Sequence, residues 1–136
     1  MAVRILIVDD NPVVRNTVRS FLSYHSLRVC GEAADGQEAV EKARQLKPDI
    51  VLLDINMPGM NGIQTASEIL AALRKTKIVF LTVHNNPGTV NATRMWSHGF
   101  VAKSAIGTAL IPTLNSVAES SGGRRPRRQK PAPTGA

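Results

Sequence analysis

Three carboxylates at the ends of two apolar runs are the residues of this chain best suited to chemistry. Asp9 and Asp10 follow the apolar residues 5–8, and Asp54 follows residues 50–53. Both runs are short and rich in branched aliphatic side chains, as in parallel strands that are buried on both faces. Three acids in one crevice would raise each other's pKa unless a divalent cation lay among them. The pattern therefore predicts a site for a hard metal ion with oxygen ligands.

The rest of the chain alternates between runs typical of strands and runs with helical periodicity. Strands are expected at residues 5–8, 27–33, 50–53, 78–81 and 100–102. Helices are expected at residues 12–22, 39–46, 63–73, 87–98 and 108–119. Asn11 before Pro12 is typical of a helix start, and Gly99 is expected to end the fourth helix. Pro112 is tolerable near the start of the last helix if Thr108 caps it, and would kink a helix that began earlier.

Five strands that alternate with five helices through short connections predict an α/β fold. The expected architecture is a doubly wound (βα)5 unit with a parallel five-stranded sheet in the order 2-1-3-4-5. In that order the winding reverses between the first and third strands, and ligands bind at the carboxyl ends of the strands there. Asp9, Asp10 and Asp54 lie at those two strand ends. The fold class and the acidic residues thus indicate the same site.

The net charge of +7 arises mainly from the C-terminal segment. Beyond Ser120 the chain has five basic residues, no acid and no large apolar side chain. Such a segment cannot bury enough surface to offset the entropy lost on ordering. We expect residues 1–120 to form one domain and residues 121–136 to form a disordered basic tail. The tail is either solvated or in contact with a phosphate backbone or an anionic membrane surface, and its lack of aromatic residues disfavours stacking on single-stranded nucleic acid.

Cellular location is suggested by the N-terminus and by the cysteine content. The first apolar run ends at Asp9, far short of the roughly 20 residues that cross a bilayer and unlike a signal sequence. Cys30 is the only cysteine and can form no disulfide within the chain, which fits a reducing compartment. We expect a cytoplasmic protein with no membrane span.

Four motifs, in order, resemble those of the receiver domain of bacterial two-component response regulators. They are ILIVDDNP at residues 5–12, DIVLLDINMPGMNG at 49–62, LTVH at 81–84 and GFVAKS at 99–104. The similarity extends from residue 3 to about residue 119. The opening DDNPVVR and the KS ending are most like the branch that usually carries a C-terminal helix-turn-helix transcription domain. The fold implied is flavodoxin-like.

The resemblance implies an aspartyl-phosphate site that contains Mg²⁺. Asp54 would be the phosphoacceptor, attacking in its ionised form the phosphohistidine of a sensor kinase. Asp10 would bind Mg²⁺ directly and Asp9 through water, with Asp54 beside the ion. The backbone carbonyl of Asn56 would complete the protein ligands.

Further roles are implied for Thr82 after the fourth strand, for Phe100 in the fifth strand and for Lys103 after it. Lys103 would neutralise phosphoryl charge, and Thr82 would hydrogen-bond a phosphoryl oxygen. Phe100 would be an aromatic switch that turns inward when Thr82 moves toward the phosphate. The simpler alternatives are an exposed lysine, an ordinary strand threonine and a core phenylalanine.

Val83 and His84, the two residues that follow Thr82, are candidates for adjusting the rates of phosphorylation and of phosphoryl loss. Val83 is bulkier than the small residue usual in this family and is expected to narrow access to Asp54. His84 either adjusts the loss of the phosphoryl group or is a solvent-exposed loop histidine.

The function implied is a phospho-accepting signalling domain and not an enzyme. Its partner would be a sensor histidine kinase or phosphotransfer protein, and no nucleic-acid-binding module is recognised in this chain. Output is expected from the face formed by residues 87–98, 100–102 and 108–119, which a partner protein or a second copy would bind. The alternative is the regulatory half of a helix-turn-helix transcription factor whose DNA-binding domain is absent from this chain. A Mg²⁺-dependent phosphatase is disfavoured because Asn56 stands where such an enzyme has a second acid.

Overall fold

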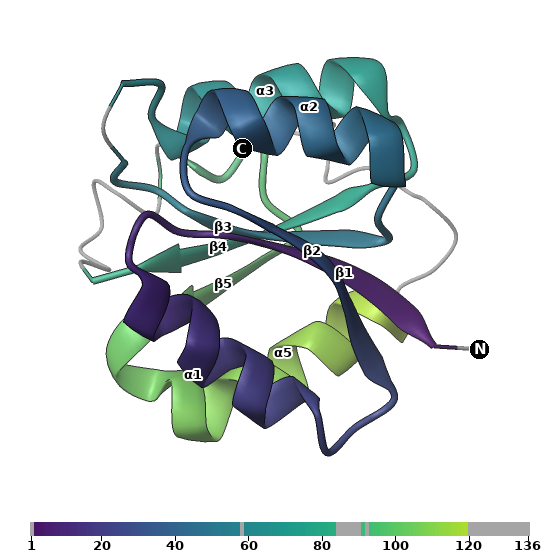
Figure 1. Cartoon of the computed structure of the whole chain (residues 1–136), viewed down its shortest axis with the longest axis vertical. Helices are drawn as coiled ribbons and strands as arrows, with labels where there is room; N and C mark the ends of the chain where they lie inside the picture. The colour runs from purple at the N-terminus through teal and green to yellow at the C-terminus, as the bar shows by residue number, and fades with distance from the viewer. Residues whose placement is uncertain (1, 58, 84–90, 92, 120–136) are drawn as a thin grey trace.

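The computed structural model describes residues 2–57, 59–83, 91 and 93–119, and it confirms the predicted sheet. All strands are parallel and follow the order β2-β1-β3-β4-β5 (Figure 1). The strands are β1 (Val3–Val8), β2 (Leu27–Ala33), β3 (Ile50–Asp54), β4 (Lys77–Thr82) and β5 (Gly99–Ala102). The helices are α1 (Pro12–Leu22), α2 (Gly36–Leu46), α3 (Gly62–Ala72) and α5 (Ile106–Glu119), with a short 3₁₀ turn η1 (Lys103–Ala105) before α5.

The helices form one layer on each face of the sheet. Figure 1 shows α2 and α3 above the sheet and α1 and α5 below it. Successive strand side chains point to opposite faces. Leu6 and Val8 therefore pack in the core between the sheet and helices α2 and α3, while Ile5 and Ile7 pack in the core between the sheet and helices α1 and α5. The unbroken apolar runs of β1 and β3 follow from this burial on both faces. None of the helices in the described residues has the length and apolar composition of a membrane span.

Three helix starts are fixed by polar side chains that bind free backbone N–H groups. The Asn11 side chain accepts a hydrogen bond from the Val13 N–H, with Pro12 in the first turn, as predicted. Asp35 caps α2 and Asn61 caps α3 in the same manner. Each capped helix follows a strand in the chain, so its amino end lies at the carboxyl edge of the sheet.

Three expectations about the C-terminal third are wrong. Helix α5 begins at Ile106 and not at Thr108, because η1 runs directly into it, so Pro112 lies inside the helix and cannot donate to the Thr108 carbonyl. Gly99 is the first residue of β5 and not a helix cap. A Cβ on Gly99 would lie 3.0 Å from side-chain atoms of both Thr113 and Val117, so glycine here lets α5 approach β5 closely. Of the helix expected at residues 87–98, residues 87–90 and 92 lie outside the described residues, while residues 91 and 93 are helical. The expectation that the helix continues to residue 98 is wrong, because residues 94–98 form a turn and a bend that lead into β5. The segment 121–136 also lies outside the described residues.

Gly62 is expected to be indispensable to the β3–α3 connection. A Cβ there would lie 2.3 Å from the Asp54 carbonyl oxygen and 2.6 Å from the Ile55 Cα, both of them backbone atoms. We expect Gly62→Ala to lower the free energy of unfolding by at least about 2 kcal/mol, because the backbone at Asp54 must move. Urea unfolding measures the change.

Gly107 provides the matched control for this substitution. It lies in α5, and the nearest atom to an added Cβ is 3.8 Å away on Phe21. Gly107→Ala should therefore stabilise the protein by about 0.5 to 1 kcal/mol through helix propensity. A Gly62→Ala protein as stable as wild type would show that the backbone of Asp54 and Ile55 leaves room for a Cβ at position 62.

Candidate functional site

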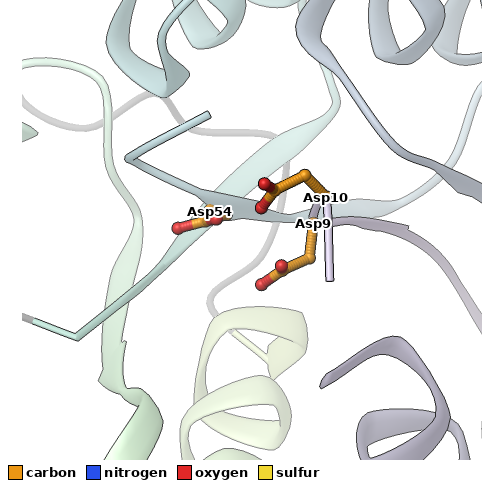
Figure 2. A group of neighbouring side chains, drawn as sticks. All are labelled: Asp9, Asp10 and Asp54. Atoms are coloured by element: carbon orange, nitrogen blue, oxygen red, sulfur yellow. The ribbon is translucent and has the colours of Figure 1, made fainter. Parts of the chain in front are cut away.

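Asp9, Asp10 and Asp54 converge where β1 and β3 end. One carboxylate oxygen of each lies within 4.8 Å of those of the other two, and Figure 2 shows the three side chains gathered at neighbouring strand ends. The parallel pairing of β1 with β3 extends to Val8 opposite Leu53. Asp9 directly follows the end of β1, and Asp54 is the last residue of β3, so the two lie side by side at the carboxyl edge of the sheet. The structure thus brings together the three acids that the sequence places at strand ends.

The three acids differ in their access to water. Asp9 is 1% exposed and Asp54 2% exposed, whereas Asp10 is an exposed residue. Burial of an ionised carboxylate is costly unless cations or hydrogen-bond donors surround it. The buried pair therefore needs partners, which Lys103 and two backbone N–H groups provide.

Lys103 supplies the positive charge of the site. Its Nζ lies 2.8 Å from Asp9 Oδ2 and 3.4 Å from Asp54 Oδ2. The residue follows the last residue of β5 at the start of η1, so its side chain reaches past the ends of β4 and β3 to the acids. Lys103 is thus a site residue and not an exposed surface lysine.

Backbone N–H groups complete the contacts of the two buried acids. The Asn11 N–H donates to Asp9 Oδ1 at 2.9 Å, and the Asn56 N–H donates to Asp54 Oδ1 at 3.2 Å. Asp9 Oδ2 is buried, and no donor among the described residues meets it in hydrogen-bond geometry, although Lys103 is close. This oxygen is available to a cation or to a water bound to one.

Burial and like charge shift the ionisation of the site. Burial, with the nearby charge of Asp9, raises the pKa of Asp54 to about 6, and Lys103 and the Asn56 N–H only partly offset this. Burial alone would lower the pKa of Lys103, but its contacts with Asp9 and Asp54 outweigh burial and raise it. Lys103 is therefore a permanent cation at neutral pH, while Asp54 loses its proton close to neutrality.

The donor set fits Mg²⁺. Mg²⁺ takes hard oxygen ligands, is often bound by only one or two carboxylates, and keeps several waters. The site offers the exposed carboxylate of Asp10, the Oδ2 of Asp9 that pairs with Lys103, and the carboxylate of Asp54 within one small space. Asn56 is exposed two residues after Asp54, the last residue of β3.

The other predicted site residues lie on β4 and β5. Thr82 is fully buried at the carboxyl end of β4, the strand next to β3. Phe100 is half-buried on β5, opposite Phe80, and packs against the core under α2 and α3. Val83 is 64% exposed just beyond β4, and His84 lies outside the described residues.

Arg15 is a contributor to the site that the sequence patterns did not single out. Its Nη1 donates to the backbone carbonyl oxygen of Asp9 at 2.6 Å. It lies four residues after the cap Asn11 on α1, and no local pattern predicts that its side chain folds back onto the end of β1.

Comparison with known proteins places this geometry in a family. The family model for the response regulator receiver domain matches residues 5–115. The chain belongs to this receiver domain family. Receiver domains in general bind Mg²⁺ at an acidic pocket, interact with histidine kinases or phosphotransfer proteins, and serve in signalling and not as enzymes.

Curated relatives include both single-domain and longer regulators. The receiver is 36% identical over 120 residues to the chemotaxis protein CheY of Thermotoga maritima, covering 88% of this chain and all of that protein. It is 34% identical to the nitrate/nitrite response regulator NarL of Escherichia coli and 35% identical to the uncharacterized transcriptional regulatory protein YxjL of Bacillus subtilis. These matches cover 84% and 85% of this chain. The chain spans about half the length of NarL and YxjL, 54% in each case.

Solved receivers superpose closely on this one. The signal receiver domain of the putative response regulator NarL from Mycobacterium tuberculosis has a TM-score of 0.82 at 33% identity, covering 88% of this chain and 98% of that one. CheY in a CheX–CheY complex of Borrelia burgdorferi with BeF3 and Mg²⁺ has a TM-score of 0.80 at 26% identity, covering 85% and 88%. The flavodoxin-like fold predicted from the sequence is confirmed.

Proposed function

We propose that this receiver accepts a phosphoryl group on Asp54 from the phosphohistidine of a sensor histidine kinase or phosphotransfer protein. The observation that carries the proposal is the position of the Asp54 carboxylate. It lies within 4.8 Å of Asp9 and Asp10 and has Oδ2 3.4 Å from Lys103 Nζ. A nucleophile flanked by a cation and by further metal-binding carboxylates suits attack on an anionic phosphoryl group.

The bond changes are those of a phosphoryl transfer. An oxygen of ionised Asp54 bonds to phosphorus, the bond between phosphorus and the histidine nitrogen breaks, and an acyl phosphate forms. Bound Mg²⁺, held by Asp10, Asp9 and the Asn56 carbonyl, would offset the negative charge of the carboxylates and of the phosphoryl oxygens. Lys103 lies on the β5 side of Asp54 and would pair with a phosphoryl oxygen there.

Thr82, which is buried, and Phe100, which is half-buried, connect this site to an output surface. Thr82, at the end of β4, would donate its hydroxyl to a phosphoryl oxygen, and Phe100 on β5 would change its packing when Thr82 moves. The positions of the two residues support these roles, because β4 lies between β3 and β5 and Phe100 is half-buried against the core. The output face would include β5 and α5 together with residues 87–98. A signalling partner or a second copy of the receiver would bind there.

Two organisations are compatible with this mechanism. The CheY relative, matched over its whole length, favours a receiver that acts through its own surface. NarL and YxjL, matched over about half their length, favour the regulatory half of a transcription factor. We propose the first, with residues 1–120 as the receiver and residues 121–136 as a basic tail. Sequencing the complete reading frame would decide between them.

The proposed function is tested by intact-mass measurement after incubation with Mg²⁺ and acetyl phosphate. We expect a single labile phosphoryl adduct on the wild-type chain and none on Asp54→Asn. Glu41→Gln removes an exposed carboxylate of α2 instead and should leave the adduct unchanged. An adduct that persists on Asp54→Asn, or its absence from wild type with both acetyl phosphate and candidate kinases, would overturn the proposal.

A further inference from the structure

Asp9 is held by polar contacts at its backbone and at both carboxylate oxygens. Its N–H donates to the Ala33 carbonyl at 3.1 Å, and its Oδ1 accepts from the Asn11 N–H at 2.9 Å. Its Oδ2 lies 2.8 Å from Lys103, and its carbonyl oxygen accepts from Arg15 at 2.6 Å. Three of these contacts come from the backbone or from the charged centre of the site. The Arg15 contact comes from the side chain of a residue that plays no part in the proposed chemistry.

The Arg15 guanidinium bridges two separate elements. Nη1 donates to the Asp9 carbonyl, while Nε donates to Glu32 Oε1 on β2 at 3.0 Å. The Arg15 and Glu32 side chains are only 19% and 21% exposed, so water screens their pairing less than that of an open surface pair. The planar guanidinium group has several N–H donors in fixed positions, so it can bind the Asp9 carbonyl and the Glu32 carboxylate at the same time. The single ammonium group of a lysine cannot reach both acceptors in the same geometry.

Glu32 is itself held in place. Its other carboxylate oxygen, Oε2, pairs with Arg19 one turn further along α1, and its backbone carbonyl accepts from Lys42 Nζ at 2.5 Å. Helices α1 and α2, from opposite faces of the sheet, thus both reach this residue of the edge strand β2. The chain of contacts from β2 through Arg15 ends on the peptide unit that joins Asp9 to Asp10.

We propose that Arg15 is a positioning residue for Mg²⁺ binding, fixing the peptide between Asp9 and Asp10 so that both carboxylates face the ion. This inference rests on the proposed metal site. The two neighbouring acids repel each other, and without an anchor on their shared peptide Asp10, which is exposed, can turn away into solvent. Loss of a residue that orients metal ligands costs about 10- to 100-fold in metal affinity.

The sign of the effect separates positioning from simple electrostatics. A positive charge near a cation site weakens cation binding, so removal of Arg15 would tighten Mg²⁺ binding if its charge alone mattered. If Arg15 acts by holding the peptide, its removal weakens binding despite the loss of positive charge. Arg15→Lys keeps the charge and the aliphatic stem but loses the planar guanidinium donors. Arg15→Gln loses both the charge and these donors.

The experiment is calorimetric titration of Mg²⁺ into the metal-free full chain, with urea unfolding of each variant to confirm that it is folded. We expect the dissociation constant to rise about 10- to 100-fold for both Arg15→Lys and Arg15→Gln. Arg28→Gln, which removes the same charge from the exposed start of β2, should bind Mg²⁺ as wild type does. Asp10→Asn, which removes a proposed ligand, should bind far more weakly.

The outcomes distinguish this inference from the function on which it rests. If wild type does not bind Mg²⁺, or Asp10→Asn binds it equally well, the metal site and the inference both fail. If those two behave as expected but the Arg15 variants bind Mg²⁺ as wild type or more tightly, only the positioning role is overturned. Lower unfolding free energy with an unchanged dissociation constant would show that Arg15 stabilises the fold alone. Should Arg15→Gln not fold, Arg15→Lys decides the question.

Discussion

Lys103→Met is expected to destabilise the metal-free protein by about 3 kcal/mol and to prevent formation of the phosphoryl adduct. Removing one partner of a buried ion pair costs about 3 to 5 kcal/mol because the other charge is left uncompensated. The lower end of this range applies because the Lys103 side chain is 18% exposed and because Asp54 can take up a proton instead. Methionine keeps a long unbranched side chain, so the lost charge is the main change.

Added Mg²⁺ should restore part of the stability of Lys103→Met. A cation that binds the folded state alone stabilises it by mass action, and here it would also replace the missing positive charge. Urea unfolding in a chelator and then in excess Mg²⁺ measures both effects, with Lys75→Met, an exposed lysine, as the control. A Lys103→Met protein as stable as Lys75→Met in the chelator would show that the acids do not depend on this ammonium group.

Asp54→Asn is expected to make the metal-free protein more stable above about pH 6, by up to about 3 kcal/mol. Burial and Asp9 raise the pKa of Asp54 from 3.8 to about 6 in the folded protein. Between these values the folded state binds more protons than the unfolded state, so the stability of the wild type falls as the pH rises through this window. Below the window both states of the wild type are protonated and the advantage of Asn disappears.

The measurement is the difference in unfolding free energy between Asp54→Asn and wild type in a chelator at several pH values from about 4 to 7.5. The difference should grow with pH and level off above the folded pKa of about 6. Mg²⁺ at the highest pH should reduce the advantage, because the ion favours ionised Asp54. A difference that stays constant or shrinks as the pH rises would contradict the sign derived from burial.

The convergence of the acids could be predicted from the sequence because it depends on local patterns and on one topological rule. Asp9, Asp10 and Asp54 directly follow apolar runs, and the carboxyl ends of parallel strands share one edge of the sheet. Helix starts with a capping side chain, such as Asn11, were predictable for the same local reason. The catalytic and switch roles of Lys103, Thr82 and Phe100 stay predictions, although their strand-end or half-buried positions fit them.

Features that depend on how elements pack could not be predicted. Arg15 and Glu32 lie on different elements, and their contact exists only because α1 packs beside the edge strand β2. Thr108 is a good capping residue and so predicts a helix start there, whereas in the structure η1 continues directly into α5 at Ile106. Glycine is common at helix ends, which is why the sequence predicts a cap at Gly99. The structure instead shows Gly99 in β5, where Thr113 and Val117 of α5 leave little room for a side chain.

The side chain of Lys103 connects the edge strand β5 with the central strands β1 and β3 at their carboxyl ends. Its backbone joins β5 to the turn before α5, while its ammonium group is bound to acids at the ends of β1 and β3. An anion attached to Asp54 would compete with Asp9 for this group, and so would change how tightly the C-terminal helix is tethered to the centre of the molecule. Phosphorylation of Asp54 would then change the position of α5 through Lys103 itself, in addition to the change proposed for Thr82 and Phe100.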